Sequence, residues 1–428
     1  MPSNLIVNTY EEILKEELRL AMGCTEPIAI AYAAAILRDA LGADPKRIRA
    51  GLSGNIIKNV KSVIVPMTDG RHGIASAIAA GIISARPDLK LEVLSALPDG
   101  SGDAIDALIS RTEIQIEEVI SPCTFELRIE GECDELFAKV HISATHTNVT
   151  LVEVSGCDVT EKYAEKSASD VQKSSSDRGL LSVESIIEFA SEVDLGEIAP
   201  YLKRQIDMNM AIAKEGLTGT WGASIGKILL ESDGSVATRA KAYAAAGSDA
   251  RMSGCELPVC IISGSGNQGI TSSVPVAIYA EHIGASEEEL LRALIVADLI
   301  TIHQKTGIGT LSAYCGAISA GVGAAAGICY LLGGDFHAVA HTIVNAVAIL
   351  SGTICDGAKP SCAAKIAMAV EAGILGYNMA MAGKQFYGGD GIVTKGVDNT
   401  VRNIGILARE GMRETDKTIL EIMLSDGC

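Results

Sequence analysis

Residues 306–334, TGIGTLSAYCGAISAGVGAAAGICYLLGG, and residues 336–355, FHAVAHTIVNAVAILSGTIC, contain no charged side chain. Each run is long enough to cross a bilayer. Both are rich in small residues, however, and the second carries Asn345, His337 and His341, which are costly to bury in lipid. We therefore expect a buried helical hairpin rather than the alternative, a pair of membrane spans.

Helical patterns extend from this hairpin in both directions along the chain. Residues 89–158 differ, because they show five strand-like segments, beginning with KLEVLSAL at residues 90–97, and one helical pattern among them. A polar, Ser-rich segment at residues 160–178 indicates a linker. We predict an α+β fold that consists of a mostly helical catalytic domain of packed Ala/Gly-rich helices, residues 1–88 and 178–428, and a small inserted α+β domain with its linker, residues 89–177.

The composition limits the possible partners. A formal net charge of -18 argues against nucleic acid and anionic membranes, because phosphate contacts need clustered Lys and Arg. Aromatic residues make up only 4% of the chain, so the core must be built from smaller side chains. A helical surface rich in Ala and Gly would also suit a homodimer.

The chain has eleven cysteines, an odd number that cannot pair completely within one molecule. Its first twenty residues are acidic and lack the basic and then apolar pattern of a secretion signal. We therefore expect a cytoplasmic protein with reduced thiols, in which cysteines serve a metal, catalysis or core packing.

Three of these cysteines stand beside turns. Cys355 and Cys362 flank Gly357 and Pro360 in SGTICDGAKPSC, and Cys315 lies between glycines in TLSAYCGAISAG. An iron–sulfur cluster needs thiolates that converge from turns, and three ligands would leave one iron open for a substrate. A helix that starts near Cys362, with Lys359 nearby, would favour the thiolate.

Other interpretations of the cysteines stay open. A free cysteine is often a small buried hydrophobe, and each of the three taken singly fits that description. Cys255 and Cys260 in GCELPVC form a rival pair for zinc, although partner ligands are not evident.

Cys24 precedes Thr25, Glu26 and Pro27, which form a typical helix start. A helix N-terminus lowers the pKa of a thiol, so Cys24 could be a nucleophile or a base. The alternative is a residue beside a helix cap with no role in catalysis.

Small anions have several candidate ligands. GSGNQG at residues 264–269 matches the dinucleotide fingerprint weakly, since Pro275 interrupts the helix expected after it. We prefer a loop in which backbone N–H groups and Asn267 bind a carboxylate. Asn55 in SGN could serve likewise, and His303 precedes a Gly-rich turn where a helix end would favour imidazolium. Simple turns and a capping histidine are the alternatives.

Five motifs together resemble the L-cysteine desulfidase family, which is similar to the iron–sulfur L-serine dehydratases. They are CTEP at 24–27, SGN at 53–55, GSGNQG at 264–269, AYCGA at 313–317 and ICDGAKPSC at 354–362. The resemblance covers nearly the whole chain.

The resemblance implies a [4Fe-4S] cluster on Cys315, Cys355 and Cys362, with Cys24 as the catalytic proton acceptor. Thr25, Glu26, Asn55, Asn267 and His303 are the candidate substrate-binding residues. The implied reaction is β-elimination on L-cysteine, a small amino-acid substrate, to give pyruvate, ammonia and sulfide.

Two other functions remain as alternatives. Serine dehydratases carry a CDP-type motif where this chain has CDGAK, so the leaving group could be a thiol or a hydroxyl. An L-serine dehydratase with the same cluster is therefore the second candidate, and a non-enzymatic amino-acid sensor is the third.

Overall fold

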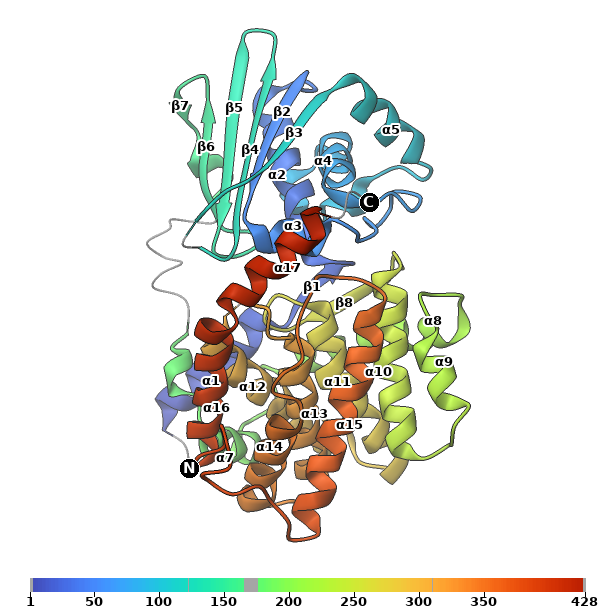
Figure 1. Ribbon diagram of the computed structural model, residues 1–428, viewed down its shortest axis with the longest axis vertical. Coiled ribbons are helices and arrows are strands. Elements are labelled where there is room, and N and C mark those ends of the chain that lie inside the picture. The colour runs from blue at the N-terminus through green and yellow to red at the C-terminus, as the bar shows by residue number, and fades with distance from the viewer. Residues whose placement is uncertain (1–2, 122, 165–175, 310, 426–428) are drawn as a thin grey trace.

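The computed structural model describes residues 3–121, 123–164, 176–309 and 311–425, and it folds into two lobes (Figure 1). One lobe holds a six-stranded sheet covered by helices, and the other is a bundle of helices. The predicted α+β fold, mostly helical, is therefore confirmed. Residues 165–175 of the predicted linker lie outside the described residues.

The sheet of the first lobe has the strand order β3-β2-β4-β5-β6-β7, with β2 and β3 parallel and the other pairs antiparallel. Alternate residues of β2 and β4 face either a core or solvent, as strand geometry requires. On the solvent face, Arg47 pairs with Glu113 and Glu132 on the two neighbouring strands. The strands are β2 (Arg47–Leu52), β3 (Glu113–Glu118), β4 (Glu126–Cys133), β5 (Leu136–Ser143), β6 (Val149–Val154) and β7 (Cys157–Asp158).

Helix α2 covers the other face of this sheet and is buried over nearly its whole length. Helix α4 packs on α2, and α5 packs on α4. The helices of this lobe are α2 (Thr25–Leu41), α3 (Gly54–Val60), α4 (Gly73–Ser84) and α5 (Gly102–Arg111), with short 3-10 helices η1 (Pro87–Ala96) and η2 (Thr160–Lys162).

The boundary between the two lobes lies earlier in the chain than the sequence indicated. Residues 24–82 share one hydrophobic core with the strands, whereas the sequence grouped residues 1–88 with the helical domain. The segment at 90–97, expected to be a strand, lies in η1, where Pro87 opens a 3-10 turn and Lys90 adopts a left-handed conformation. Strand β2 was not expected, because two arginines interrupt its apolar residues.

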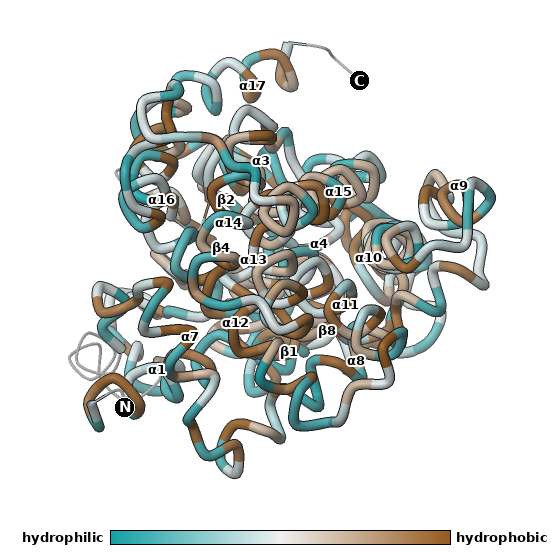
Figure 2. The backbone as a smooth tube through the Cα atoms, turned by 90° about the horizontal axis from the view of Figure 1, so that it is seen from below, coloured by the Kyte–Doolittle hydropathy of each residue, from teal (hydrophilic) through white to brown (hydrophobic). Residues whose placement is uncertain are grey.

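The second lobe packs its helices around α13. Figure 2 shows α13 in the middle of the bundle, whereas the outer helices α16 and α17 alternate hydrophilic and hydrophobic residues. The helices are α1 (Asn4–Glu17), α7 (Val183–Glu192), α8 (Ala199–Thr218), α9 (Ile225–Leu230), α10 (Val236–Met252), α11 (Gly266–Ile283), α12 (Glu287–Ile308), α13 (Gly316–Leu331), α14 (Phe336–Leu350), α15 (Ser361–Met381), α16 (Val397–Ile406) and α17 (Arg413–Ser425), with short segments η3 (Arg178–Leu180) and η4 (Leu407–Gly411).

Small residues set the distance between these helices. A Cβ added to Gly323 of α13 would lie 2.1 Å from Oγ1 of Thr301 on α12, so only glycine permits this close approach. The predicted hairpin is confirmed as α13 and α14, and among the described residues no helix is both long and apolar enough to span a membrane. These Ala- and Gly-rich surfaces mostly pack against other helices of the same chain. The homodimer that the sequence suggested therefore stays a prediction.

Two elements connect the lobes. Strand β1 (Arg19–Met22), just before α2, pairs antiparallel with β8 (Pro258–Ile261), just before α11. Helix α17 leaves the bundle and packs on α3, where Leu420 joins the core of the sheet lobe (Figure 1). The hydroxyl of Thr25, the first residue of α2, donates to the carbonyl of Gly264, two residues before α11, so these two helices begin near each other.

Asp298 of α12 is a fully buried carboxyl group in the helical core. Its Oδ1 accepts hydrogen bonds from Gln205 Nε2 (3.1 Å) and Ser272 Oγ (2.8 Å), while Oδ2 has no partner. Burial raises the pKa of Asp298 to about 7, although both hydrogen bonds act to lower it.

We expect Asp298→Asn to stabilise the protein at pH 8. Because the pKa of Asp298 is higher in the folded than in the unfolded state, its contribution to stability is complete below about pH 4 and is lost as the pH rises through about 7. Asparagine resembles the protonated carboxyl, so its advantage in free energy of unfolding should grow to on the order of 2 kcal/mol at pH 8. Urea unfolding at pH 5 and pH 8 measures this difference.

The matched control is Asp207→Asn, which changes an exposed carboxyl group on α8. It should shift stability by the same small amount at both pH values. An Asp298→Asn advantage that does not grow between pH 5 and pH 8 would contradict the assigned ionisation.

Candidate active site

A pocket lies between the two lobes, with about 810 Å³ of empty space including its open mouth. That volume is typical of sites for small molecules. Five of the described helices begin at this pocket, so their positive ends point toward one space. The residues at these starts are Cys24 before α2, Ser53 before α3, Ser265 before α11, Cys315 before α13 and Pro360 before α15.

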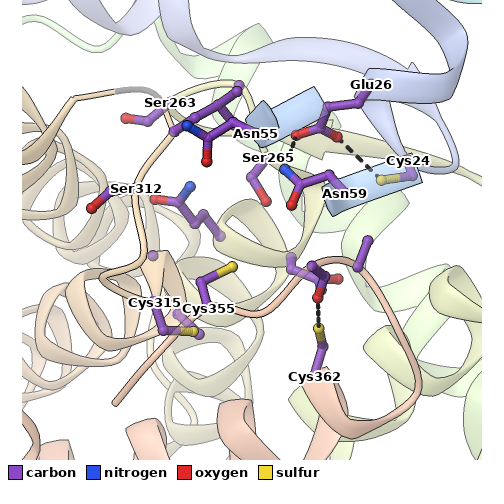
Figure 3. Close-up of a pocket in the computed structure, with 18 of the residues that line it drawn as sticks. Cys24, Glu26, Asn55, Asn59, Ser263, Ser265, Ser312, Cys315, Cys355 and Cys362 are labelled. Atoms are coloured by element: carbon purple, nitrogen blue, oxygen red, sulfur yellow. Dashed lines mark hydrogen bonds between the residues drawn. The ribbon is translucent and has the colours of Figure 1, made fainter. Parts of the chain in front are cut away.

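A short antiparallel bridge brings Cys315 and Cys355 together. Tyr314 and Ile354 are paired residues of this bridge, and the N–H of Cys315 donates to the carbonyl of Thr353 at 3.1 Å. The N–H of Cys355 donates to the carbonyl of Ala313. Two cysteines forty residues apart therefore occupy one wall of the pocket (Figure 3).

Cys362 reaches the same pocket from the first turn of α15. Its Sγ lies 3.6 Å from the carbonyl oxygen of Gly357, in the turn that follows Cys355. Gly357 has φ of 100°, and an added Cβ would lie 2.4 Å from the carbonyl oxygen of Lys58 in the other lobe. Glycine thus lets the turn between the two cysteines touch α3.

The electrostatics of these thiols differ from the sequence-based expectation. Lys359 forms an ion pair with Asp356 rather than with a thiolate. Burial raises the pKa of Cys315 to about 12, with a further contribution from Cys355, and burial also raises the pKa of Cys362. Cysteines bind metals as thiolates, so metal loading would release protons.

The described residues contain no group of three His, Cys, Asp or Glu side chains arranged to hold a single metal ion. This applies to the rival pair Cys255 and Cys260 as well, both of which are buried in the helical core. A polynuclear cluster is a different case, because each cysteine binds its own iron and the sulfurs need not meet at one point.

Cys24 faces the three cysteines from the other lobe, and its thiol donates to Glu26 Oε2 at 3.2 Å (Figure 3). Glu26 Oε1 accepts a bond from Asn59 Nδ2 at 2.9 Å. Burial and then the Glu26 carboxylate raise the pKa of Cys24 well above its usual value. The expectation that the helix N-terminus would lower this pKa is wrong, since burial and a neighbouring negative charge outweigh the dipole.

Glu26 itself is ionised at neutral pH. Burial acts to raise the pKa of Glu26, but His146 and the hydrogen bonds from Cys24 and Asn59 leave it below its usual value. Burial also lowers the pKa of His146, so the hydrogen bonds from Cys24 and Asn59 are the part of this effect that does not require a charged imidazole.

The other predicted substrate-binding residues lie in different places. Asn55 and Asn267 line the pocket, but Oδ1 of Asn267 already accepts a bond from Arg251 Nη1 at 3.1 Å. Thr25 donates to the carbonyl of Gly264 at 2.8 Å and so connects the lobes just behind the pocket. The helix α11 continues through Pro275, which the sequence analysis expected to interrupt it.

His303 lies outside the group of described residues that line the pocket. Its Nε2 is 2.8 Å from Oδ1 of Asp398, at the start of α16. The helix α12 runs on to Ile308, so His303 is not at the helix end where the sequence placed it.

Sequence reasoning missed two buried cations of the pocket, Arg251 and Lys305. Nε and Nη2 of Arg251 donate to the carbonyl of Gly23, at 3.1 and 2.8 Å, and hold the start of α2. Burial lowers the pKa of Lys305 to about 8. A charged residue at an otherwise apolar helical position was the one available signal for both.

Comparisons with known proteins cover nearly the whole chain. A family model described as the serine dehydratase alpha chain matches residues 127–421. A UPF0597 protein of Desulfitobacterium hafniense (strain Y51) is 53% identical over 418 residues, which make up 97% of this chain and 96% of the relative. A UPF0597 protein of Finegoldia magna is 45% identical over 427 residues, 98% of this chain and 100% of the relative.

We expect Glu26→Gln to make Cys24 more reactive. Removing the negative charge lowers the pKa of the Cys24 thiol, and each unit of that shift raises the thiolate fraction about tenfold below the pKa. The measurement is the rate at which methyl methanethiosulfonate labels the Cys24 peptide at pH 8.5, followed by mass spectrometry.

Cys260, a fully buried thiol away from Glu26, is the internal control and should label at an unchanged rate. Faster labelling of both cysteines would indicate local unfolding instead. An unchanged Cys24 rate in Glu26→Gln would show that the carboxylate does not control this thiol.

Proposed function

The chain belongs to the serine dehydratase alpha-chain family, and from this membership we propose that it is an iron–sulfur lyase that acts on L-cysteine. The relationship to serine dehydratases that the motifs indicated is thereby confirmed, while the names of the relatives do not mention L-cysteine. The observation that carries the proposal is the convergence of Cys315, Cys355 and Cys362 on one buried pocket, opposite Cys24.

The donor set fits a [4Fe-4S] cluster. Cys315, Cys355 and Cys362 supply three soft sulfur ligands that line one pocket, and they would bind iron as thiolates after losing their protons. Held by three cysteines, such a cluster keeps one iron open and supplies a Lewis acid for the leaving sulfur.

The protein's own residues carry the proton transfer in this proposal. Glu26 accepts the proton of the Cys24 thiol along their hydrogen bond, and the Cys24 thiolate then removes the Cα proton of the substrate. The Cβ–S bond breaks with its electron pair on sulfur, which leaves as hydrosulfide. The resulting aminoacrylate tautomerises to an imine, and water converts it to pyruvate and ammonia.

The raised pKa of Cys24 affects how this thiol removes the Cα proton. Its thiolate is scarce at neutral pH, but once formed it is a stronger base than an ordinary cysteine thiolate. Glu26 is the only carboxylate among the described residues that line the pocket, and it is ionised. A thiol hydrogen-bonded to a carboxylate is the arrangement that lets this base form at the substrate.

L-Serine is the second candidate substrate, and the matching family model favours it. The same residues would then remove the Cα proton while a hydroxyl group leaves. The three thiols and the Cys24–Glu26 pair are compatible with either leaving group. An assay with both amino acids therefore has to decide which one is the substrate.

We expect anaerobic reconstitution with iron and sulfide to give a broad absorbance near ~400 nm, where thiolate-bound clusters absorb. Replacing Cys315, Cys355 and Cys362 together with alanine should remove most of it. The double variant Cys255→Ala, Cys260→Ala is the matched control and should keep the absorbance. A triple variant with the spectrum of the wild type would exclude this ligand set.

We expect the reconstituted protein to release pyruvate and sulfide from L-cysteine. Cys24→Ser should lower turnover by ~100-fold or more and keep the cluster absorbance, because only the base is lost. Pyruvate from L-serine alone would identify a dehydratase instead. Binding of L-cysteine with no product would support the sensor.

A further inference from the structure

The cations of the pocket differ in whether they have partners. Lys58 donates to the carbonyl of Cys355 and forms an ion pair with Asp416 of α17. Arg251 donates to the carbonyl of Gly23 and to Asn267. The ammonium group of the third cation, Lys305, has neither a hydrogen bond nor an ion pair with any residue that the structure describes.

Lys305 extends from the last turns of α12 and is 5% exposed. Its electrostatic neighbours are the thiols of Cys315 and Cys355 and, more weakly, Glu17. A largely buried ammonium group that has no anionic partner is costly, so binding of an anion beside Lys305 would be favourable. The anion must enter the pocket next to the three cysteines.

Unpartnered hydrogen-bond acceptors line the same pocket. Nδ2 of Asn59 donates to Glu26, which fixes the amide orientation and leaves Oδ1 buried without a donor. Oε1 of Gln268 and Oδ1 of Asn55 are also buried without a donor. Buried acceptors of this kind call for a ligand that carries N–H groups.

We propose that this pocket recognises the zwitterion of an α-amino acid, with Lys305 binding the carboxylate and Oδ1 of Asn59 accepting from the ammonium group. The inference rests on the proposed function and names how that site selects its substrate class. One free ammonium and several free acceptors complement a carboxylate and an ammonium on the same small molecule. The start of α13, which follows Cys315, adds partial positive charge on the side of Lys305.

Three small molecules without a leaving group test this on the reconstituted protein. L-Alanine carries both charges, L-alaninamide lacks the carboxylate, and propionate lacks the ammonium group. Calorimetric titration should show that the wild type prefers L-alanine to either of the others by about ten- to hundredfold, as expected for a charged hydrogen bond.

Lys305→Met should lose the preference for L-alanine over L-alaninamide, while its preference for L-alanine over propionate should remain. Lys305→Arg should restore part of the first preference. The matched control is Lys203→Met, which removes an exposed lysine of α8 that pairs with Glu287. It should bind all three compounds as the wild type does.

The outcomes separate this inference from the proposed function. A wild type that binds none of the three compounds overturns this inference, whereas a reconstituted protein that releases no pyruvate from L-cysteine or L-serine overturns the proposed function. A Lys305→Met variant that keeps the full preference for L-alanine over L-alaninamide overturns the role of Lys305 alone. If Lys305→Met instead loses the absorbance at about 400 nm and Lys305→Arg keeps it, Lys305 balances the charge of the cysteines and the carboxylate role is overturned.

Discussion

The convergence of helix starts on one pocket is the constraint on which the rest of the site depends. Helices α2 and α3 come from the sheet lobe, and α11, α13 and α15 come from the helical lobe. Each start leaves backbone N–H groups without intrahelical partners and carries partial positive charge. A space surrounded by such groups favours a bound anion such as a substrate carboxylate, although burial outweighs this effect at the cysteine thiols.

That convergence requires the two lobes to dock in one position. Arg251 of the helical lobe holds the carbonyl before Cys24, and Lys58 of the sheet lobe holds the carbonyl of Cys355. Asp416 of α17 joins Lys58 and also accepts from the N–H of Ala313, two residues before Cys315. The contacts that join the lobes therefore also position the proposed cluster ligands and the proposed base.

Much of the site was predictable from short motifs. Gly357 and Pro360 indicated a turn that could present two thiols, and the residues around Cys24 indicated a helix start. The electrostatics were not predictable in this way. Whether a thiol beside a helix start is acidic depends on burial and on the side chain that accepts its hydrogen bond, which for Cys24 is Glu26. His303 looked equally suitable in sequence, yet it pairs with Asp398 instead.

The sequence by itself determined the helical hairpin, the strands of residues 113–154 and the turns that carry the cysteines, because these follow from local hydrophobic periodicity and from Gly and Pro. Only the tertiary structure decided that residues 24–82 belong with the sheet, that the turn of Cys315 pairs with that of Cys355, and that the ammonium group of Lys305 has no partner in the part of the chain that the structure describes. These features depend on contacts between segments far apart in the chain. Such contacts are set by the packing of whole helices, and a local pattern carries no record of them.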